Sequence, residues 1–178
     1  MVIVQLTGLS GAGKTSLAQA VQRELLSKKY PVEIIDGDDY RQTLCKDLGF
    51  SEKDRKENIR RLGFVAEKLA KFKVIVIVAA INPYEISRLE LRGRYSNVKT
   101  VWIKCSMETL INRDTKGLYK RAMLEHGDKD KLMNLSGIND VYEEPEVIDL
   151  VIETDCESLD QSAQKLLQLI LDSLPTSR

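Results

Sequence analysis

Five short apolar runs, rich in β-branched residues, alternate along the chain with longer segments whose apolar residues recur at helical spacing. Within the short runs few polar residues interrupt the apolar ones, which is typical of strands covered by helices on both faces. Strands are predicted at 2–7, 32–36, 74–80, 99–105 and 149–154. Helices are predicted at 14–28, 52–71, 84–94, 106–112, 116–126 and 158–173. This alternation predicts an α/β fold with a five-stranded parallel sheet, helices on both faces and right-handed crossovers.

Length and composition favour one globular domain spanning residues 1–178. The chain is 43% hydrophobic and 30% charged, with no internal repeat and no linker rich in Pro, Gly or Ser. Its 27 basic and 27 acidic residues cancel, so no overall field favours nucleic acid or membrane, and any anion site must be local. No apolar run approaches the roughly 20 residues of a membrane helix, and the start lacks the basic lead of a signal peptide.

The three cysteines, Cys45, Cys105 and Cys156, are widely spaced and form no C-x-x-C pair. This pattern provides neither a disulfide framework nor a zinc site, and it favours reduced thiols. Together with the composition, it predicts a cytoplasmic protein with no nucleic-acid and no membrane partner.

The segment GLSGAGKT follows the first predicted strand and opens the first helix, which is the required context of a P-loop. Glycines let the backbone wrap a phosphate, and successive N–H groups and the helix dipole point at it. A glycine-rich turn that merely caps a helix is the alternative. We expect a P-loop NTPase fold in which the lysine reaches the β- and γ-phosphates and the threonine hydroxyl binds Mg²⁺. The expected ATP-binding residues are Gly8, Leu9, Ser10, Gly11, Ala12, Gly13, Lys14 and Thr15.

Two carboxylates, Asp36 and Asp38, flank a glycine at the end of the second predicted strand. Ligands of such sheets bind beyond the carboxyl ends of the strands. One carboxylate there can orient Mg²⁺ waters, and the other can accept a proton from an attacking hydroxyl. The alternative is an N-cap for a short helix, which Asp38 or Asp39 alone could provide; for Asp39, the cap or solvent is the expectation.

The predicted helix 52–71 begins after Ser51, a favourable N-cap, with Asp54 as a short version of the capping-box acid. Its apolar stripe changes character at the N-terminal end, where Arg55 and Asn58 occupy the inward side. A buried arginine is costly unless it meets an anion, so this end is expected to face a cleft that holds a charged substrate. A structural salt bridge from Arg55 to a nearby aspartate is the alternative. Glu57 is expected to pair with Arg61 on the solvent side.

The densest basic cluster follows the fourth predicted strand and consists of Arg113, Lys116, Lys120 and Arg121. Mobile cationic lids of this kind close over phosphates and exclude water, so residues 113–140 are interpreted as a lid. A solvated basic helix is the alternative. His126 lies in a polar stretch and is expected to be exposed.

These motifs together resemble the adenylylsulfate (APS) kinase family. The similarity is carried in order by GLSGAGKT, DGDDYR, LGFSEKDRKENIRR, RDTKGLYKRA and GINDVYEEP, and it spans nearly the whole chain. It implies an enzyme of sulfate assimilation that phosphorylates the 3′-hydroxyl of adenosine 5′-phosphosulfate with Mg²⁺–ATP, giving PAPS and ADP. It also implies a homodimer.

The resemblance further implies roles for individual residues. Asp38 would be the base toward the 3′-hydroxyl, with Asp36 near the metal and ribose and Lys14 in the catalytic set. Phe50 would stack on the adenine of APS, and Arg113 would lie beside the adenine of ATP. The implied APS-binding residues are Asp36, Asp38, Arg41, Phe50, Arg55, Asn58, Ile81, Asn82, Lys116 and Leu135.

Two positions and one segment depart from the family pattern. Asn82 stands where the family usually has serine, which excludes a phosphoserine form at this position. Leu135 stands where a phenylalanine would form the second wall around the adenine of APS. The segment MLEHGDKDKLMN is longer than the usual connection.

Two other functions remain open. One is a kinase of the same fold that acts on a different small nucleotide or anionic hydroxyl acceptor. The other is a non-catalytic nucleotide-binding module, against which the intact Lys14, Thr15, Asp36 and Asp38 argue.

Overall fold

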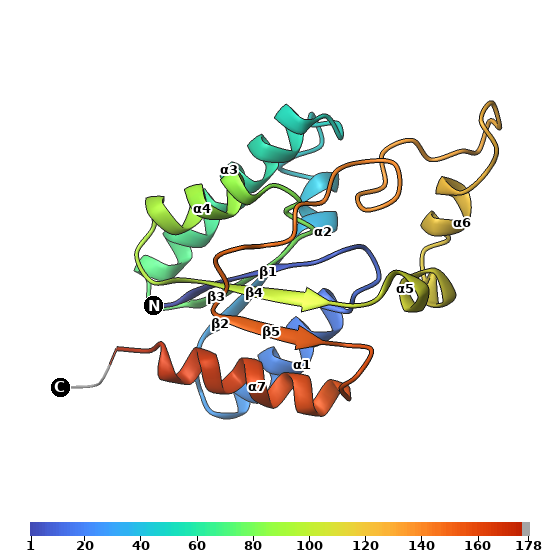
Figure 1. Ribbon diagram of the computed structural model, residues 1–178. Coiled ribbons are helices and arrows are strands. Elements are labelled where there is room, and N and C mark those ends of the chain that lie inside the picture. Colours follow the sequence, from blue (N-terminus) through green and yellow to red (C-terminus); the bar gives the residue numbers. More distant parts are fainter. Residues whose placement is uncertain (176–178) are drawn as a thin grey trace.

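A computed structural model describes residues 1–175 and contains one parallel sheet of five strands in the order β2-β3-β1-β4-β5. The strands are β1 (Ile3–Thr7), β2 (Val32–Asp36), β3 (Ile75–Ala79), β4 (Val98–Lys104) and β5 (Leu150–Glu153). All five agree with the predicted runs to within one residue at each end. Figure 1 shows the three layers, with α1 and α7 on one face of the sheet and α3 and α4 on the other. The predicted α/β fold is confirmed.

The mostly apolar character of the strands comes from two separate cores, one on each face of the sheet. On the face of α1 and α7, alternate strand residues such as Val4, Leu6 and Ile77 are buried. On the opposite face, Ile35, Val76 and their neighbours pack against α3 and α4. Because both faces are covered, neither side of a strand needs polar residues.

Seven helices occur within the described residues: α1 (Lys14–Ser27), α2 (Gly37–Gln42), α3 (Glu52–Lys71), α4 (Glu85–Arg94), α5 (Met107–Arg113), α6 (Leu118–Ala122) and α7 (Leu159–Asp172). Ser51 caps α3, as expected, by accepting a hydrogen bond from the Asp54 N–H at 3.2 Å. The stripe of α3 is also as expected, since Arg55, Asn58 and Ile59 are all buried on its inner side.

Two helices differ from the prediction. The short helix α2 was predicted only as the alternative reading of DGDDYR, and its N-cap is Asp36, not Asp38 or Asp39. The helix predicted at 116–126 is confined to Leu118–Ala122. It starts after Gly117, whose left-handed conformation (φ 65°) places it outside the helix. Beyond it, the polar run of residues 125–131 has no apolar face to bury, and it turns at Gly127 (φ 101°).

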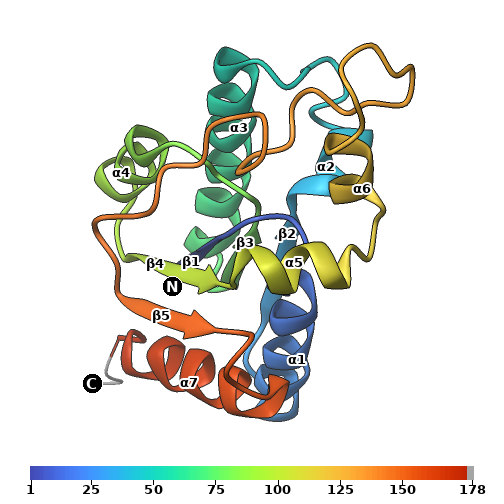
Figure 2. The same ribbon diagram turned by 45° about the vertical axis from the view of Figure 1, so that its right-hand side comes forward.

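The carboxyl ends of all five strands lie at one edge of the sheet, where α2, α5 and α6 also lie (Figure 1). The chain from α6 to residue 140 runs over the same side, above the end of the sheet (Figure 2). The fold therefore brings the phosphate loop, the carboxylates after β2 and the basic segment together. None of the helices within residues 1–175 is long and apolar enough to cross a membrane.

Candidate active site

The loop between β1 and α1 is built from backbone conformations that only glycine adopts readily. Gly11 (φ 77°) and Gly13 (φ 96°) are left-handed, and Gly13 is the N-cap of α1. At Gly8 (φ 155°) a Cβ would lie 2.4 Å from the carbonyl oxygen of Ile103 in β4. The N–H groups of Gly8 and Ala12 donate to the carbonyls of Ile81 and Leu9, at 3.4 and 3.2 Å. The rest of the loop and the N-terminus of α1 can offer N–H groups to a bound phosphate.

Lys14 is folded back over this loop. Its Nζ donates to the carbonyl oxygens of Gly8 and Leu9, at 2.9 and 2.8 Å. Burial lowers the pKa of Lys14 to about 8, against the opposing effect of Asp38. The ammonium is therefore held at the phosphate loop by two neutral acceptors, which it can exchange for phosphate oxygens.

Asp36, the last residue of β2, bonds to the start of α1 and to the start of α2 through its carboxylate. Its Oδ2 accepts from the Thr15 hydroxyl at 2.7 Å, and its Oδ1 accepts from the Asp38 N–H at 2.9 Å. A hydroxyl and a carboxylate are hard oxygen donors of the type that Mg²⁺ prefers. No group of three or more His, Cys, Asp or Glu side chains that could hold an ion occurs within residues 1–175. The Thr15 hydroxyl and the Asp36 carboxylate are of the type that fits Mg²⁺.

Asp38 is largely exposed and forms an ion pair with Lys116 from the basic segment. Lys116 lies just before α6, so this pair joins the segment to the strand end at which the proposed base lies. Two other members of the basic cluster, Lys120 and Arg121, are exposed, and Arg121 donates to the Asp130 carbonyl at 3.1 Å. His126 is exposed, as expected.

A single cavity of about 350 Å³ connects the phosphate loop with most of the predicted acceptor residues. Twelve predicted site residues line it: Ser10, Gly11, Gly13, Lys14, Thr15, Asp36, Asp38, Phe50, Arg55, Ile81, Lys116 and Leu135. A smaller cavity of about 60 Å³ shares Asp38, Phe50, Arg55 and Ile81 with the first. The smaller cavity adds three more predicted residues, Arg41, Asn58 and Asn82.

Arg55 is buried, and its positive charge is balanced within the protein. Its guanidinium donates to Asp140 and to the Asn134 carbonyl, both at 2.7 Å, and to the Phe50 carbonyl at 3.0 Å. The structural salt bridge, which is the alternative role of Arg55, is therefore present. Arg55 nevertheless lines both cavities, and its neighbour Asn58 has a buried side-chain oxygen with no partner.

The ring of Phe50 is half exposed and lies against two arginines. The Arg41 guanidinium carbon is 4.5 Å from the ring centroid and that of Arg55 is 5.4 Å. Burial, with Arg55 as the next contribution, lowers the pKa of Arg41. Leu135, by contrast, is only 4% exposed and packs in the core on the side of α1. The two residues predicted to enclose the adenine of APS thus differ: Phe50 is a half-exposed ring beside two arginines, and Leu135 is a packed aliphatic side chain.

Asn82 borders the smaller cavity, but its amide is turned into the protein. The residue has a left-handed backbone (φ 43°), and its Nδ2 donates to the side-chain oxygen of Gln5 at 3.2 Å. The Ile81 carbonyl accepts from the Thr7 hydroxyl at 2.7 Å. The turn after β3 is therefore fixed to β1, the strand that leads into the phosphate loop.

Four predicted residues do not line either cavity: Gly8, Leu9, Ala12 and Arg113. Gly8, Leu9 and Ala12 belong to the phosphate loop, on its side away from the cavities. Arg113 is exposed, and its guanidinium donates to the Thr154 carbonyl at 2.7 Å. Its contact with the adenine of ATP stays a prediction.

Four residues at or near the cavity were missed by sequence reasoning, three of them in the irregular segment before β5 and one in α6. Asn134 and Ser136 line the larger cavity, and Asp140 balances Arg55. Tyr119 is buried in α6, and its hydroxyl donates to the Ser10 carbonyl at 2.8 Å, while burial raises its pKa to about 12. The tyrosine could have been found as the apolar anchor of a basic helix, and Asp140 as an acid within GINDVYEEP. Asn134 and Ser136 had no local pattern.

Comparisons with known proteins agree with this geometry. Residues 1–153 match the family model described as adenylylsulphate kinase. The chain belongs to this family. A relative from Microcystis aeruginosa named adenylyl-sulfate kinase is 44% identical, over 93% of this chain and 88% of the relative. Another adenylyl-sulfate kinase, from Chloroflexus aurantiacus, is 45% identical over 93% of this chain and 87% of the relative.

Among solved structures, the APS kinase of Mycobacterium tuberculosis, in complex with AMPPNP and APS, superposes with a TM-score of 0.89. It is 36% identical, and the match covers 96% of this chain and 97% of that one. The P-loop kinase fold is thereby shown, and the chain is a nucleotide-dependent kinase.

Proposed function

We propose that this chain transfers the γ-phosphoryl group of ATP to the 3′-hydroxyl of adenosine 5′-phosphosulfate, giving PAPS and ADP. The observation that carries the proposal is the shared cavity of about 350 Å³. It is lined by Lys14 and Thr15 on one side and by Asp38, Arg55 and Leu135 on the other. Donor loop and acceptor groups face one space, as direct transfer between two bound nucleotides requires.

Asp38 is the proposed base. As the acceptor oxygen bonds to the γ-phosphorus, the hydroxyl proton passes to the carboxylate and the bond to the bridging oxygen of ADP breaks. Lys14 and the loop N–H groups hold the phosphates in line. Thr15 and Asp36 would hold Mg²⁺, which neutralises phosphate charge when bound. The ion pair of Asp38 with Lys116 must open before the base can meet a hydroxyl.

The basic segment at about 113–140 is proposed as the lid of the single kinase domain. Its attachment to the phosphate loop through Tyr119 and to Asp38 through Lys116 supports this role. When Lys116 leaves Asp38, its charge becomes available to the transferring phosphoryl group, where it stabilises the negative charge of the transition state. Closure would also exclude water, which would otherwise compete with the acceptor.

The acceptor side is proposed to grip the phosphosulfate with Arg41, Arg55 and Asn58. The unpartnered oxygen of Asn58 supports a ligand with a hydrogen-bond donor, such as a ribose hydroxyl. Phe50 and Leu135 would enclose the adenine, and the backbone of Ile81 and Asn82 would form the floor. Arg113 is proposed to lie beside the adenine of ATP.

The test is ADP release with Mg²⁺ and ATP, measured with and without micromolar APS, with the product identified by mass. We expect strong stimulation by APS and a product heavier than APS by one phosphate group. ATP binding without stimulation by APS would overturn the proposal and favour another phosphorylated or sulfated hydroxyl acceptor. ATP binding with no ADP release, whichever hydroxyl acceptor is supplied, would argue for a non-catalytic nucleotide-binding module.

A further inference from the structure

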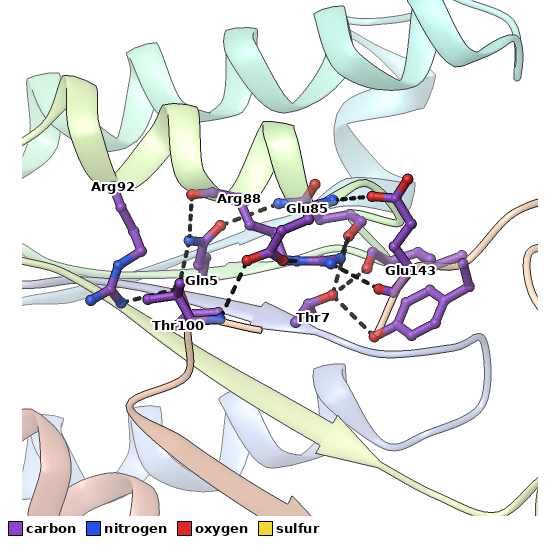
Figure 3. Close-up of polar contacts among 11 residues, drawn as sticks. Gln5, Thr7, Glu85, Arg88, Arg92, Thr100 and Glu143 are labelled. Atoms are coloured by element: carbon purple, nitrogen blue, oxygen red, sulfur yellow. Dashed lines mark hydrogen bonds and ion pairs between the residues drawn. The ribbon is translucent and has the colours of Figure 1, made fainter. Parts of the chain in front are cut away.

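A network of polar side chains, most of them buried, lies between β1, β4 and α4 (Figure 3). At its centre is Arg88, which is 1% exposed and is the largest fully buried side chain within residues 1–175. Burying a guanidinium is costly unless its N–H groups are paired. Arg88 lines neither of the two cavities, so its burial needs a reason other than direct contact with a substrate.

The contacts of Arg88 join two segments that lie far apart in the sequence. Nη1 donates to the Asn82 carbonyl at 2.7 Å, and Nη2 donates to the Glu143 carbonyl at 2.8 Å. The Nε group donates to Glu85 at 2.6 Å, which balances the charge. Asn82 belongs to the turn at residues 81–83, here called the acceptor turn. Glu143 ends the segment at residues 134–143, here called the covering segment.

Glu143 makes two further bonds, one to the acceptor turn and one to the first residue of α4. The Glu143 N–H donates to the Pro83 carbonyl at 2.8 Å, and the Glu143 carboxylate accepts from the Glu85 N–H at 2.6 Å. The acceptor turn contributes Ile81 to the larger cavity, and the covering segment contributes Asn134, Leu135 and Ser136. Arg88 therefore fixes the distance between the acceptor turn and the covering segment, both of which line the larger cavity, without lining that cavity itself.

Gln5 also holds the acceptor turn in position. It lies in the middle of β1 and is 2% exposed. Its Nε2 donates to the Arg88 carbonyl at 3.1 Å and to the Thr100 hydroxyl at 2.8 Å. Since a carbonyl can only accept, the orientation of the Gln5 amide is fixed, and its oxygen must accept from Asn82. This contact holds Asn82 in the left-handed conformation that bends the acceptor turn.

We propose that Arg88 and Gln5 are positioning residues for the acceptor. They act through the acceptor turn and the covering segment, without contact with either nucleotide, and this inference rests on the proposed phosphoryl transfer. Both segments touch the acceptor side of the cavity. The phosphate loop meets the acceptor turn at a long bond from the Gly8 N–H to the Ile81 carbonyl (3.4 Å), and its conformation is set by Gly11 and Gly13. Loss of Arg88 or Gln5 should therefore raise the acceptor KM and leave the KM for ATP unchanged.

Arg92 offers a matched control, because it lies one helical turn after Arg88 on α4 (Figure 3). It is also an arginine in the polar network, and it pairs with Asp149 and donates to Thr100 at 3.2 Å. None of these partners belongs to the acceptor turn or to the covering segment. Arg92→Met removes a comparable ion pair and should lower stability without changing the acceptor KM.

The experiment measures steady-state KM values for APS and ATP, together with thermal unfolding, in Arg88→Met, Arg88→Lys, Gln5→Leu and Arg92→Met. We expect the KM for APS to rise roughly tenfold to hundredfold in Arg88→Met, because small misplacements of binding groups cost that much. Arg88→Lys should recover part of the loss, since an ammonium can still bond one or both carbonyls. Equal effects on the KM for APS in Arg88→Met and Arg92→Met, or equal rises for APS and ATP, would overturn the proposal.

Hydrogen exchange separates this inference from the proposed function. The N–H groups of Glu85 and Glu143 should exchange faster in Arg88→Met and Gln5→Leu than in Arg92→Met, whatever the acceptor is. If wild-type protein shows no stimulation by APS but this exchange pattern is found, the acceptor assignment fails and the positioning role survives. If APS stimulates the wild type and exchange is unchanged in Arg88→Met, the positioning role is wrong. Should Arg88→Met fail to fold, Arg88→Lys and Gln5→Leu carry the same comparison.

Discussion

The two sides of the cavity are built in opposite ways. The nucleotide side consists of eight consecutive residues, Gly8 to Thr15, whose backbone forms the site. The acceptor side gathers side chains from α2, the loop before α3, α3 itself, the turn after β3 and the covering segment. A backbone loop is specified locally by glycines, whereas a cavity of side chains depends on how distant segments are held. Substitutions on the nucleotide side and on the acceptor side should therefore impair different properties of the enzyme.

The largest effect is expected at Asp38, where the two sides meet. Asp38→Asn keeps the shape of the side chain but cannot accept the hydroxyl proton, so turnover should fall roughly 10²- to 10⁴-fold. ATP binding, measured by titration calorimetry, should persist because the phosphate loop is untouched. Asp39→Asn is the control, since Asp39 is exposed and lines neither cavity. Full activity in Asp38→Asn would remove the proposed base.

Gly8→Ala should damage the nucleotide side through its backbone. The added Cβ would lie 2.4 Å from the Ile103 carbonyl oxygen, and the φ of 155° disfavours a side chain. Strain and overpacking together should cost about 2–5 kcal/mol of the free energy of unfolding, with loss of ATP binding. Gly93→Ala is the control: it lies inside α4 with nothing within 4 Å of its Cβ. It should raise stability by about 0.5–1 kcal/mol, and equal melting temperatures for both variants would contradict the argument.

Arg55→Lys should affect the acceptor side alone. Lysine keeps the charge but loses the planar fork that bonds Asp140 and two carbonyls at once. We expect the KM for APS to rise roughly 10- to 100-fold, with the KM for ATP unchanged. Arg60→Lys, whose guanidinium pairs with Glu57 at the surface, should leave both values as they are. A rise in the KM for ATP equal to that for APS would show that the two sides are not separable.

The same contrast explains what could be predicted from the sequence. The strands and the inward stripe of α3 follow local periodicity, and the phosphate loop follows its glycine spacing. The structure brings Lys14, Asp38 and Arg55, which these patterns single out, to one cavity. The partner of Arg55 was foreseen only as some aspartate, because Asp140 lies 85 residues away across irregular chain. The role of Gln5 could not be predicted either, since its three contacts come from α4, β4 and the acceptor turn. Sequence patterns identify residues that build an element, but not the buried polar groups that join elements.

The smallest and most informative effect is expected at Leu135, the wall that departs from the family pattern. Base–aromatic stacking is worth roughly 1–3 kcal/mol per base, so Leu135→Phe should tighten the binding of APS. Leu135 is 4% exposed and packs in the core, so a larger ring should cost about 1–3 kcal/mol through overpacking. We therefore expect a net gain of less than about tenfold in APS affinity and a lower melting temperature. Phe50→Leu removes the exposed aromatic ring and should weaken APS binding both in the wild type and in Leu135→Phe. Tighter APS binding in Phe50→Leu would show that these two residues do not enclose the base. Weaker APS binding in Leu135→Phe at unchanged stability would show the same.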